Sequence, residues 1–198
     1  LVVTFITAIV FAILLNEIRS HIGKKVVQTI SYLPHFLSWI IVTGILHDML
    51  SGTGIVNEVL VNLHIIKQPI NFFAHTSYFW PIVAFANVWK ETGWNAIIYL
   101  AAITGISGEL YEAAMIDGAN RWQRMWNITL PGIRGTVVTL LIMNLGKVMG
   151  SNYERLDQFG NTQVKDFSYQ LAIYIYDKGL ASAKFSMATA VGIFQSLV

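Results

Sequence analysis

The stretch LYEAAMIDGANRWQRMWNITLPGI, residues Leu110–Ile133, is a charged and aromatic interlude in an otherwise apolar chain. Ser107 can cap a helix that starts just before it, and acidic residues in the first turn suit the positive end of that helix. Gly118 can adopt the left-handed conformation that ends a helix. The stretch therefore predicts a short helix that ends at a glycine.

A second short amphipathic helix is predicted after Gly118. Its apolar side would carry Trp122, Met125, Trp126 and Ile128. Arg121 and Arg124 would face water or lipid headgroups, and Pro131 would close the turn before the next apolar run. On this evidence alone, the helix pair could simply tether two membrane spans.

The composition of the whole chain favours a bilayer as its solvent. Of 198 residues, 55% are hydrophobic and 12% are charged, the mean hydropathy is +0.55, and the charged share is about half that of a soluble domain. The net charge of +2 comes without a dense basic run, which argues against a nucleic-acid partner. The absence of cysteine excludes a disulfide framework and thiolate metal sites. Because the chain begins and ends inside apolar runs, we expect it to be a fragment of a longer protein.

Five apolar runs predict membrane spans, so the expected fold class is an all-α polytopic membrane helical bundle whose first and last spans are truncated. The runs are Leu1–Leu15, Val26–Leu50, Tyr78–Ile106, Gly132–Met149 and Ala181–Val198. Pro34 is expected to kink the second span or to start its regular part. No internal repeat is present.

Lysine and arginine near the span ends predict the orientation. Residues 16–25 and 107–134 are rich in them and should be cytoplasmic, which makes 51–77 and 150–181 external loops. The contrast is weakened by the basic residues of 150–181, although acidic residues accompany them.

The two external loops carry amphipathic and aromatic segments. In 51–77, one helical face predicts a helix on the membrane surface, and the aromatic run 71–80 predicts an interface belt. The face is formed by Ile55, Val56, Val59, Leu60 and Leu63. In the other loop, 167–180 is either an amphipathic surface helix or part of an outer gate or binding-protein dock.

Seven fixed positions carry a resemblance to a known family. They are Glu112, Ala113, Ala114, Gly118, Ile128, Leu130 and Pro131. At this spacing they resemble the EAA loop of inner-membrane permeases of binding-protein-dependent ABC importers, of the type I, maltose-permease-like kind. YLPHFLSW, NVWKETGWNAIIYLAAITGI and ATAVGIF are similar to the sugar-uptake branch, in particular to permeases for larger oligosaccharides and polysaccharide fragments such as the alginate importer.

The resemblance implies one transmembrane permease domain over residues 1–198, multi-pass in a bacterial inner membrane, with a cytoplasmic coupling helix in the loop 107–131. In the family this helix docks in a cleft of the ATP-hydrolysing subunit. The coupling role would fall to Glu112, Ala113, Ala114, Asp117, Gly118, Ile128, Leu130 and Pro131.

The implied partners are a second related permease subunit, two ATP-binding cassette subunits, an external solute-binding protein, a glycan substrate and the lipid bilayer. The sequence holds no G-x-x-x-x-G-K-[ST] phosphate loop. We therefore expect this chain to bind no cofactor and to be no enzyme, with ATP and Mg on the partner ATPase.

Polar residues at helical spacing inside two spans predict a substrate pathway, because charged groups in a span usually face a cavity or a partner. The third span carries Asn87, Lys90, Glu91 and Trp94, and the fourth carries Asn144, Lys147 and Ser151. By position relative to the EAA loop, these residues resemble those that line the sugar site of the maltose importer's larger permease.

Lys90 and Lys147 would suit a carboxylated glycan such as a uronic-acid oligomer, with Trp89, Trp94 and Tyr99 packing against sugar faces. Alternatively, Lys90 pairs with Glu91 or with a neighbouring subunit and Lys147 snorkels outward, and the cargo is a neutral oligosaccharide. A second class of function also remains open, a structural or channel-like subunit whose cytoplasmic helix is only an assembly contact. The five histidines lack metal-site spacing, and we predict neither a metal site nor catalytic residues.

Overall fold

The computed structural model describes residues 1–146, 158–159 and 171–197. Within these residues the regular structure is helical and no strand is present, which confirms the predicted all-α class. The chain forms two compact units. The first holds Leu1–Phe36 and Asn87–Leu145, and the second holds Leu37–Ala86 and the described residues of Gly146–Val198.

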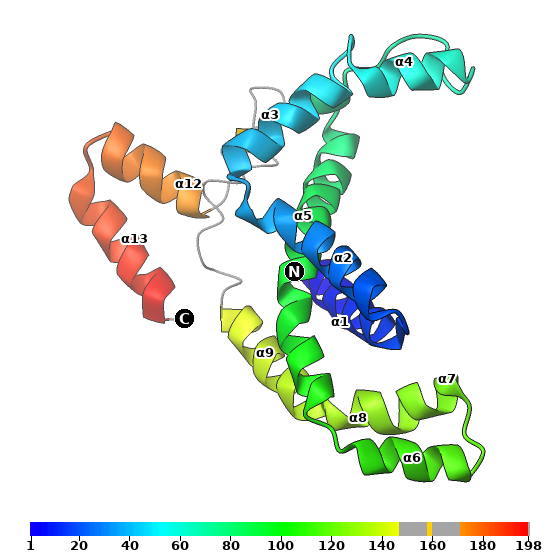
Figure 1. Ribbon diagram of the computed structural model, residues 1–198. Coiled ribbons are helices and arrows are strands. Elements are labelled where there is room, and N and C mark those ends of the chain that lie inside the picture. Colours follow the sequence, from blue (N-terminus) through cyan, green and yellow to red (C-terminus); the bar gives the residue numbers. More distant parts are fainter. Residues whose placement is uncertain (147–157, 160–170, 198) are drawn as a thin grey trace. The chain divides into compact units, whose positions relative to one another are not determined.

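The first unit is built around a small-residue contact between two long helices. Its elements are α1 (Val2–Glu17), α2 (His21–Tyr32), η1 (Leu33–Phe36), the second part of α5 (Thr76–Thr104), α6 (Gly108–Ile116), α7 (Arg121–Arg124), η3 (Met125–Thr129), α8 (Leu130–Gly132) and α9 (Arg134–Gly146). Ala8 and Ala12 of α1 and Ala96 of α5 are buried in one cluster with Tyr99. Because these alanines leave room, α1 packs closely on α5 (Figure 1).

The predicted span Val26–Leu50 is broken near Pro34, as expected. The α-helix ends at Tyr32, a 3-10 turn follows over Leu33–Phe36, and a new helix starts at Trp39. Proline has no N–H to donate to the preceding turn, which weakens the helix at this point. The side chain of Ser38 then caps the new helix by accepting a hydrogen bond from the Ile41 N–H at 3.3 Å.

The second unit has an aromatic and aliphatic core. Its elements are α3 (Trp39–Leu50), α4 (Ile55–Asn62), η2 (Phe72–Ala74), the first part of α5, α12 (Leu171–Ile175), η4 (Tyr176–Ala181) and α13 (Phe185–Leu197). Phe73 and Phe79 are 4% and 1% exposed and pack with Val42 and Val83. The prediction of an interface belt is therefore wrong for these two aromatic residues, because they fill the core instead.

The connection 51–77 contains the predicted short helix and is closed by one buried side chain. Helix α4 covers most of the predicted amphipathic segment, with Ile55 and Val59 exposed. Asn57, 1% exposed, donates to the carbonyl oxygens of Ser51 and Ile70, each at 2.7 Å. Its Oδ1 accepts from the Ile70 N–H at 2.8 Å. These bonds fasten the segments on both sides of α4, at Ser51 and Ile70, to this helix.

By length and hydropathy, the described part of the chain holds one helical stretch able to cross a bilayer, Trp39–Asn62. Arg121–Gly132 and Arg134–Gly146, bent by 56°, add a second if they are counted as one span. Two further apolar helices, α1 and α13, are shorter. The predicted apolar runs are thus largely helical, and the number of spans stays a prediction.

Candidate functional site

The predicted coupling loop is a helical hairpin around Gly118. Helix α6 starts after Ser107, whose hydroxyl oxygen accepts a hydrogen bond from the Glu109 N–H at 3.3 Å. The helix ends at Asp117, and Gly118 has φ +78°. The left-handed region strongly favours glycine, so the predicted cap and the predicted helix end are both confirmed.

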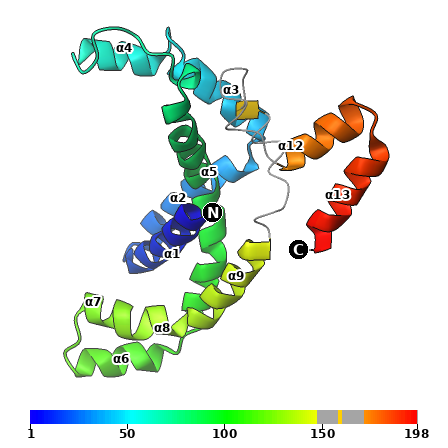
Figure 2. The same cartoon turned by 180° about the vertical axis from the view of Figure 1, so that it is seen from behind.

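A capping box starts the second arm of the hairpin. The Asn120 side chain accepts from the Gln123 N–H at 2.9 Å, and the Gln123 side chain accepts from the Asn120 N–H at 2.7 Å. After a single α-turn the chain forms a π-helical turn, Met125–Thr129, and continues through Leu130–Gly132. Figures 1 and 2 both show α6 lying alongside this arm.

In this arm Arg121 is exposed as expected, whereas Arg124 and Pro131 depart from their expectations. Trp122 and Trp126 are 68% and 60% exposed, whereas Arg124 is only half-exposed and its Nε is buried. From Met125 to Thr129 a π turn holds more residues than an α turn, so the faces of this part do not follow the 3.6-residue period used for the prediction. Pro131 does not close the turn either, because it lies near the start of a helical turn, where its missing N–H is tolerated, and the bend falls at Ile133.

The two arms are joined by a hydrogen bond that the sequence did not predict. The hydroxyl groups of Tyr111 and Thr129 lie 3.0 Å apart, and Thr129 is 2% exposed. Met125 and Leu130 pack against the core cluster of the first unit. Tyr111 lies inside the quoted motif, but nothing in the spacing of 18 residues signals this pair.

The motif residues divide into an exposed arm and a packed arm. Helix α6 buries none of its residues, and Glu112, Ala113, Asp117 and Gly118 are exposed. Ala114, Ile128 and Leu130 are half-buried, and Pro131 is exposed. At the tip, Ile116 is 87% exposed and Met115 is 51% exposed. The second arm of the hairpin therefore packs on the core of the first unit, and α6 lies on the outer side of that arm with its side chains exposed.

The polar stripe of α5 is bonded to α1 and to the break after α2. Asn87 donates to Thr4 Oγ1 at 2.6 Å. Lys90, 5% exposed, donates from Nζ to the carbonyl oxygen of His35 at 2.6 Å. Glu91 Oε2 lies 3.0 Å from His35 Nδ1, and Glu91 Oε1 lies 3.6 Å from Lys90 Nζ. The pairing of Lys90 with Glu91, one of the alternatives above, is thus present, together with a partner that the sequence did not reveal.

Trp94 completes this cluster and keeps exposed surface. Its ring stacks on His35 with centroids 4.4 Å apart and an interplanar angle of 1°, and Phe36 meets it edge-on at 5.7 Å. Trp94 is nevertheless 41% exposed. An exposed, pre-oriented indole of this kind suits packing against an apolar face of a sugar ring.

The residues predicted on the fourth span are only partly described. Asn144 is half-buried and donates to the Leu140 carbonyl oxygen of its own helix at 2.8 Å. Lys147 and Ser151 lie outside the described residues. The structure brings Lys90, Glu91 and Trp94 together at His35, places Asn87 against Thr4 of α1, and does not test the second stripe. Among the described residues, no group of three or more His, Cys, Asp or Glu is placed to hold a metal ion.

Comparisons with known proteins place the whole chain in context. Residues 4–153 match the family described as "Binding-protein-dependent transport system inner membrane component". The polygalacturonan/rhamnogalacturonan transport system permease protein YteP of Bacillus subtilis is 40% identical over 199 residues, which cover 100% of this chain and 61% of YteP. Protein LplB of the same organism is 37% identical, with 100% and 62% covered.

A solved structure is also similar over almost the whole chain. A chain in the crystal structure of a bacterial ABC transporter involved in the import of the acidic polysaccharide alginate matches with a TM-score of 0.91 and 39% identity. The match covers 98% of this chain and 67% of that one. This chain spans 61% to 62% of the length of the two curated relatives.

Proposed function

Because this chain belongs to the family of binding-protein-dependent transport system inner membrane components, we propose that it is a permease subunit of an ATP-driven importer in a bacterial inner membrane. It crosses the bilayer several times and pairs with a second, related permease. Two ATP-binding cassette subunits bind and hydrolyse ATP with Mg, and an external solute-binding protein delivers the cargo. The chain itself transmits motion and alternates between outward-open and inward-open states.

The observation that carries this proposal is the exposed arm of the hairpin. Helix α6 buries none of its side chains, and its tip exposes Met115 and Ile116. The other arm is anchored by the Tyr111–Thr129 hydrogen bond and by core contacts. An outward apolar tip on an anchored base is suited to dock into a partner and to pass a displacement to the membrane helices.

We propose an oligosaccharide or polysaccharide fragment as the cargo, and an acidic glycan in particular. The descriptions of two similar proteins reported above name acidic polymers, namely polygalacturonan and alginate. Among the predicted pathway residues we favour Trp94, because it is fixed by stacking and keeps exposed surface. Asn87 stays in the proposal with its side chain bonded to Thr4. Lys90 is committed to His35 and Glu91, so of the two predicted lysines we assign the attraction of carboxylates to Lys147.

The test is cargo-stimulated ATP hydrolysis by the complete complex in liposomes with its binding protein. Gly118→Val is expected to lose stimulation, because a β-branched residue at φ +78° is strained by about 1–2 kcal/mol or more. The Cβ would meet nothing within 4 Å, so the strain would be the only direct effect. Glu112→Ala on the same helix should also weaken the coupling.

Matched controls separate coupling from folding. Gly118→Asn should retain most of the stimulation, because asparagine tolerates the left-handed region. Gly108→Ala should behave as wild type, since Gly108 has open space around it and ordinary helical backbone. Stimulation that persists in Gly118→Val and Glu112→Ala would contradict the coupling role and favour the channel-like or structural subunit.

The cargo proposal has its own measurement in the same liposomes. Uronic-acid oligomers should stimulate hydrolysis more than neutral oligomers of equal length. Lys147→Gln should reduce this preference without changing basal hydrolysis. Equal stimulation by both oligomers would leave the importer assignment in place and make the cargo a neutral oligosaccharide.

A further inference from the structure

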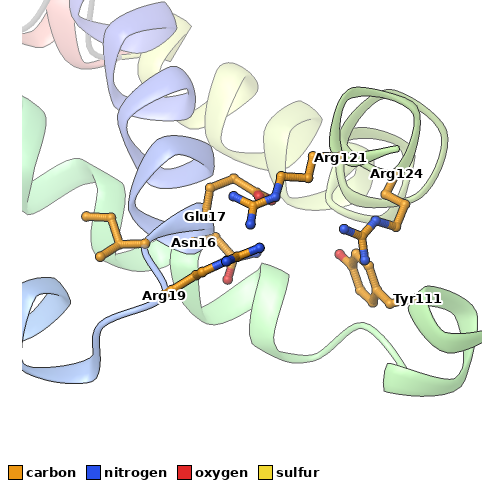
Figure 3. A pocket seen from close by; sticks show the side chains of 7 residues that line it. Asn16, Glu17, Arg19, Tyr111, Arg121 and Arg124 are labelled. Atoms are coloured by element: carbon orange, nitrogen blue, oxygen red, sulfur yellow. The ribbon is translucent and has the colours of Figure 1, made fainter. Parts of the chain in front are cut away.

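An arginine-lined pocket of about 290 Å³ lies in the first unit, between the end of α1 and the hairpin. Figure 3 shows its side chains converging from three elements. Its polar lining consists of Asn16, Glu17, Arg19, Tyr111, Arg121 and Arg124. The transport role proposed above uses none of these arginines.

The charges in this pocket do not cancel. Three arginines face one carboxylate, Glu17, which leaves a formal excess of two positive charges. Within the described part of the chain, neither Glu17 nor any of these arginines takes part in an ion pair. Such an excess of positive charge in a concave site attracts anions.

Arg124 also carries an unmet hydrogen-bond donor. Its Nε is buried and has no hydrogen-bond partner among the described residues. Leaving a buried donor without a partner is unfavourable, and more so for a charged group. Arg124 also lines the pocket, so turning its guanidinium group toward a ligand with several acceptor oxygens would recover that cost.

We propose that this pocket binds a phosphate group, carried either by an anionic lipid headgroup or by free inorganic phosphate. The guanidinium groups of Arg19, Arg121 and Arg124 present planar forks of donors that match phosphate oxygens. The amide of Asn16 adds a further donor. The excess of two positive charges nearly equals the negative charge of a phosphate monoester or of inorganic phosphate. It exceeds the single negative charge of a lipid phosphodiester.

The bound phosphate bridges the end of α1 to α7. Arg19 follows α1 directly, whereas Arg121 and Arg124 form the two ends of the short helix α7. The ligand therefore fastens the start of the second arm, next to the turn at Gly118, to the end of α1. This inference is independent of the coupling test, because its measurement is local protection by phosphate and not ATP hydrolysis.

The experiment is hydrogen exchange on the complete importer, with the full-length permease, washed in maltoside micelles that carry no phosphate. Exchange is compared after addition of inorganic phosphate and, separately, of phosphatidylglycerol. At about ten times the dissociation constant, the amides of residues 17–20 and 120–125 should exchange about tenfold more slowly. Protection by phosphatidylglycerol alone identifies a lipid headgroup, and protection by inorganic phosphate identifies a soluble ligand.

Variants decide whether the pocket is responsible. Arg121→Gln with Arg124→Gln should abolish the protection in these two segments, whereas Arg134→Gln, an exposed arginine outside the pocket, should leave it intact. Arg121→Lys with Arg124→Lys keeps the charge and should retain part of the protection, which guards against misfolding as the cause. The proposal is overturned if neither phosphate source protects these segments, or if the protection survives the double glutamine substitution.

Discussion

Lys90 is a buried charged residue in an apolar helix, and its side chain holds two elements together. Its ammonium group donates to the His35 carbonyl oxygen at 2.6 Å, directly after Pro34 has interrupted the helix. A carbonyl group at a helix break has lost its regular partner, and an ammonium donor satisfies it. Glu91 balances the charge at 3.6 Å. One lysine thus joins α5 to the break between two helices.

Replacing this lysine should weaken the fold and not the selectivity for cargo. Lys90→Met leaves the His35 carbonyl without its donor, which we expect to cost about 1–3 kcal/mol. Thermal unfolding of the purified complex should show the loss, and uptake of acidic and neutral oligomers should fall in parallel. Lys25→Met, an exposed lysine on α2, is the matched control and should have little effect. Unchanged stability with a selective loss of acidic uptake would instead make Lys90 a cargo residue.

Asn57 is a second residue whose replacement should destabilise the fold. Asn57→Ala removes three hydrogen bonds and leaves three backbone groups of Ser51 and Ile70 without them. We expect faster exchange of the Ile70 amide and a destabilisation of about 1–3 kcal/mol. Asn62→Ala, at the exposed end of the same helix, should change neither quantity. An Ile70 amide that exchanges as slowly in the variant as in the wild type would contradict this role.

For single residues, the sequence predicted which side chains share a helix better than it predicted their hydrogen-bond partners. The spacing of Asn87, Lys90, Glu91 and Trp94 correctly indicated polar positions on one helix, and their role in a substrate pathway stays a prediction. It could not indicate that His35 and Thr4 are their partners, because a hydrogen bond across 55 or 83 residues leaves no periodic trace. For the same reason, the Tyr111–Thr129 bond was missed.

Among the elements, α2 and α5 approach each other closely at one glycine. Gly93 is buried, and a Cβ placed on it would overlap the backbone carbonyl of Ser31. The missing side chain therefore lets the end of α2 lie directly against α5. This contact lies next to the Lys90–His35 hydrogen bond and supports the same helix break.

Gly93→Ala should therefore be costly even though alanine favours helices. The backbone of α2 would have to move, and overpacking of this kind costs about 1–3 kcal/mol. The control is Gly44→Ala in α3, where the added Cβ meets nothing within 4 Å, and it should be neutral or stabilising by about 0.5–1 kcal/mol. Thermal unfolding of the two variants in the same complex measures the difference. Equal melting temperatures would contradict the close contact.

Element boundaries followed from local signals where such signals exist. The break at Pro34, the cap at Ser107 and the helix end at Gly118 each rest on one residue with a strong backbone preference. The π turn at Met125–Thr129 has no such residue. An α-helical period was therefore assumed there, and the π turn was missed.

At the scale of the whole molecule, the distribution of charge predicts a topology that can be measured. This part of the chain has no cysteine, so single cysteines give a clean signal once any cysteine elsewhere in the full protein is replaced. Ile116→Cys, at a position 87% exposed, should react with an impermeant thiol reagent only from the cytoplasmic side. Glu58→Cys, exposed on α4, should react only from outside. Labelling of both from one side would contradict the predicted orientation.

The family could be predicted from the sequence because seven motif positions lie within 20 residues, and the match over residues 4–153 confirms it. The number of spans could not be fixed in the same way. Apolar helices such as α1 and α13 are shorter than a bilayer requires, and polar residues interrupt α5. Mean hydropathy reports the average preference of a segment for lipid or water. It therefore underrates a helix whose polar side chains are buried in hydrogen-bonded pairs, as they are in this chain.

The π turn of η3 also gives the hairpin arm one residue more than a regular α-helix needs. Because a π turn holds one residue more than an α turn, loss of one residue between Met125 and Thr129 would let the turn tighten into an α turn. Arg121 and Arg124 would then keep nearly the same direction relative to Pro131, whereas the spacing between Gly118 and Ile128 in the family motif would shorten by one residue. The extra residue is therefore needed for the spacing of the motif and not for the direction of the arginines.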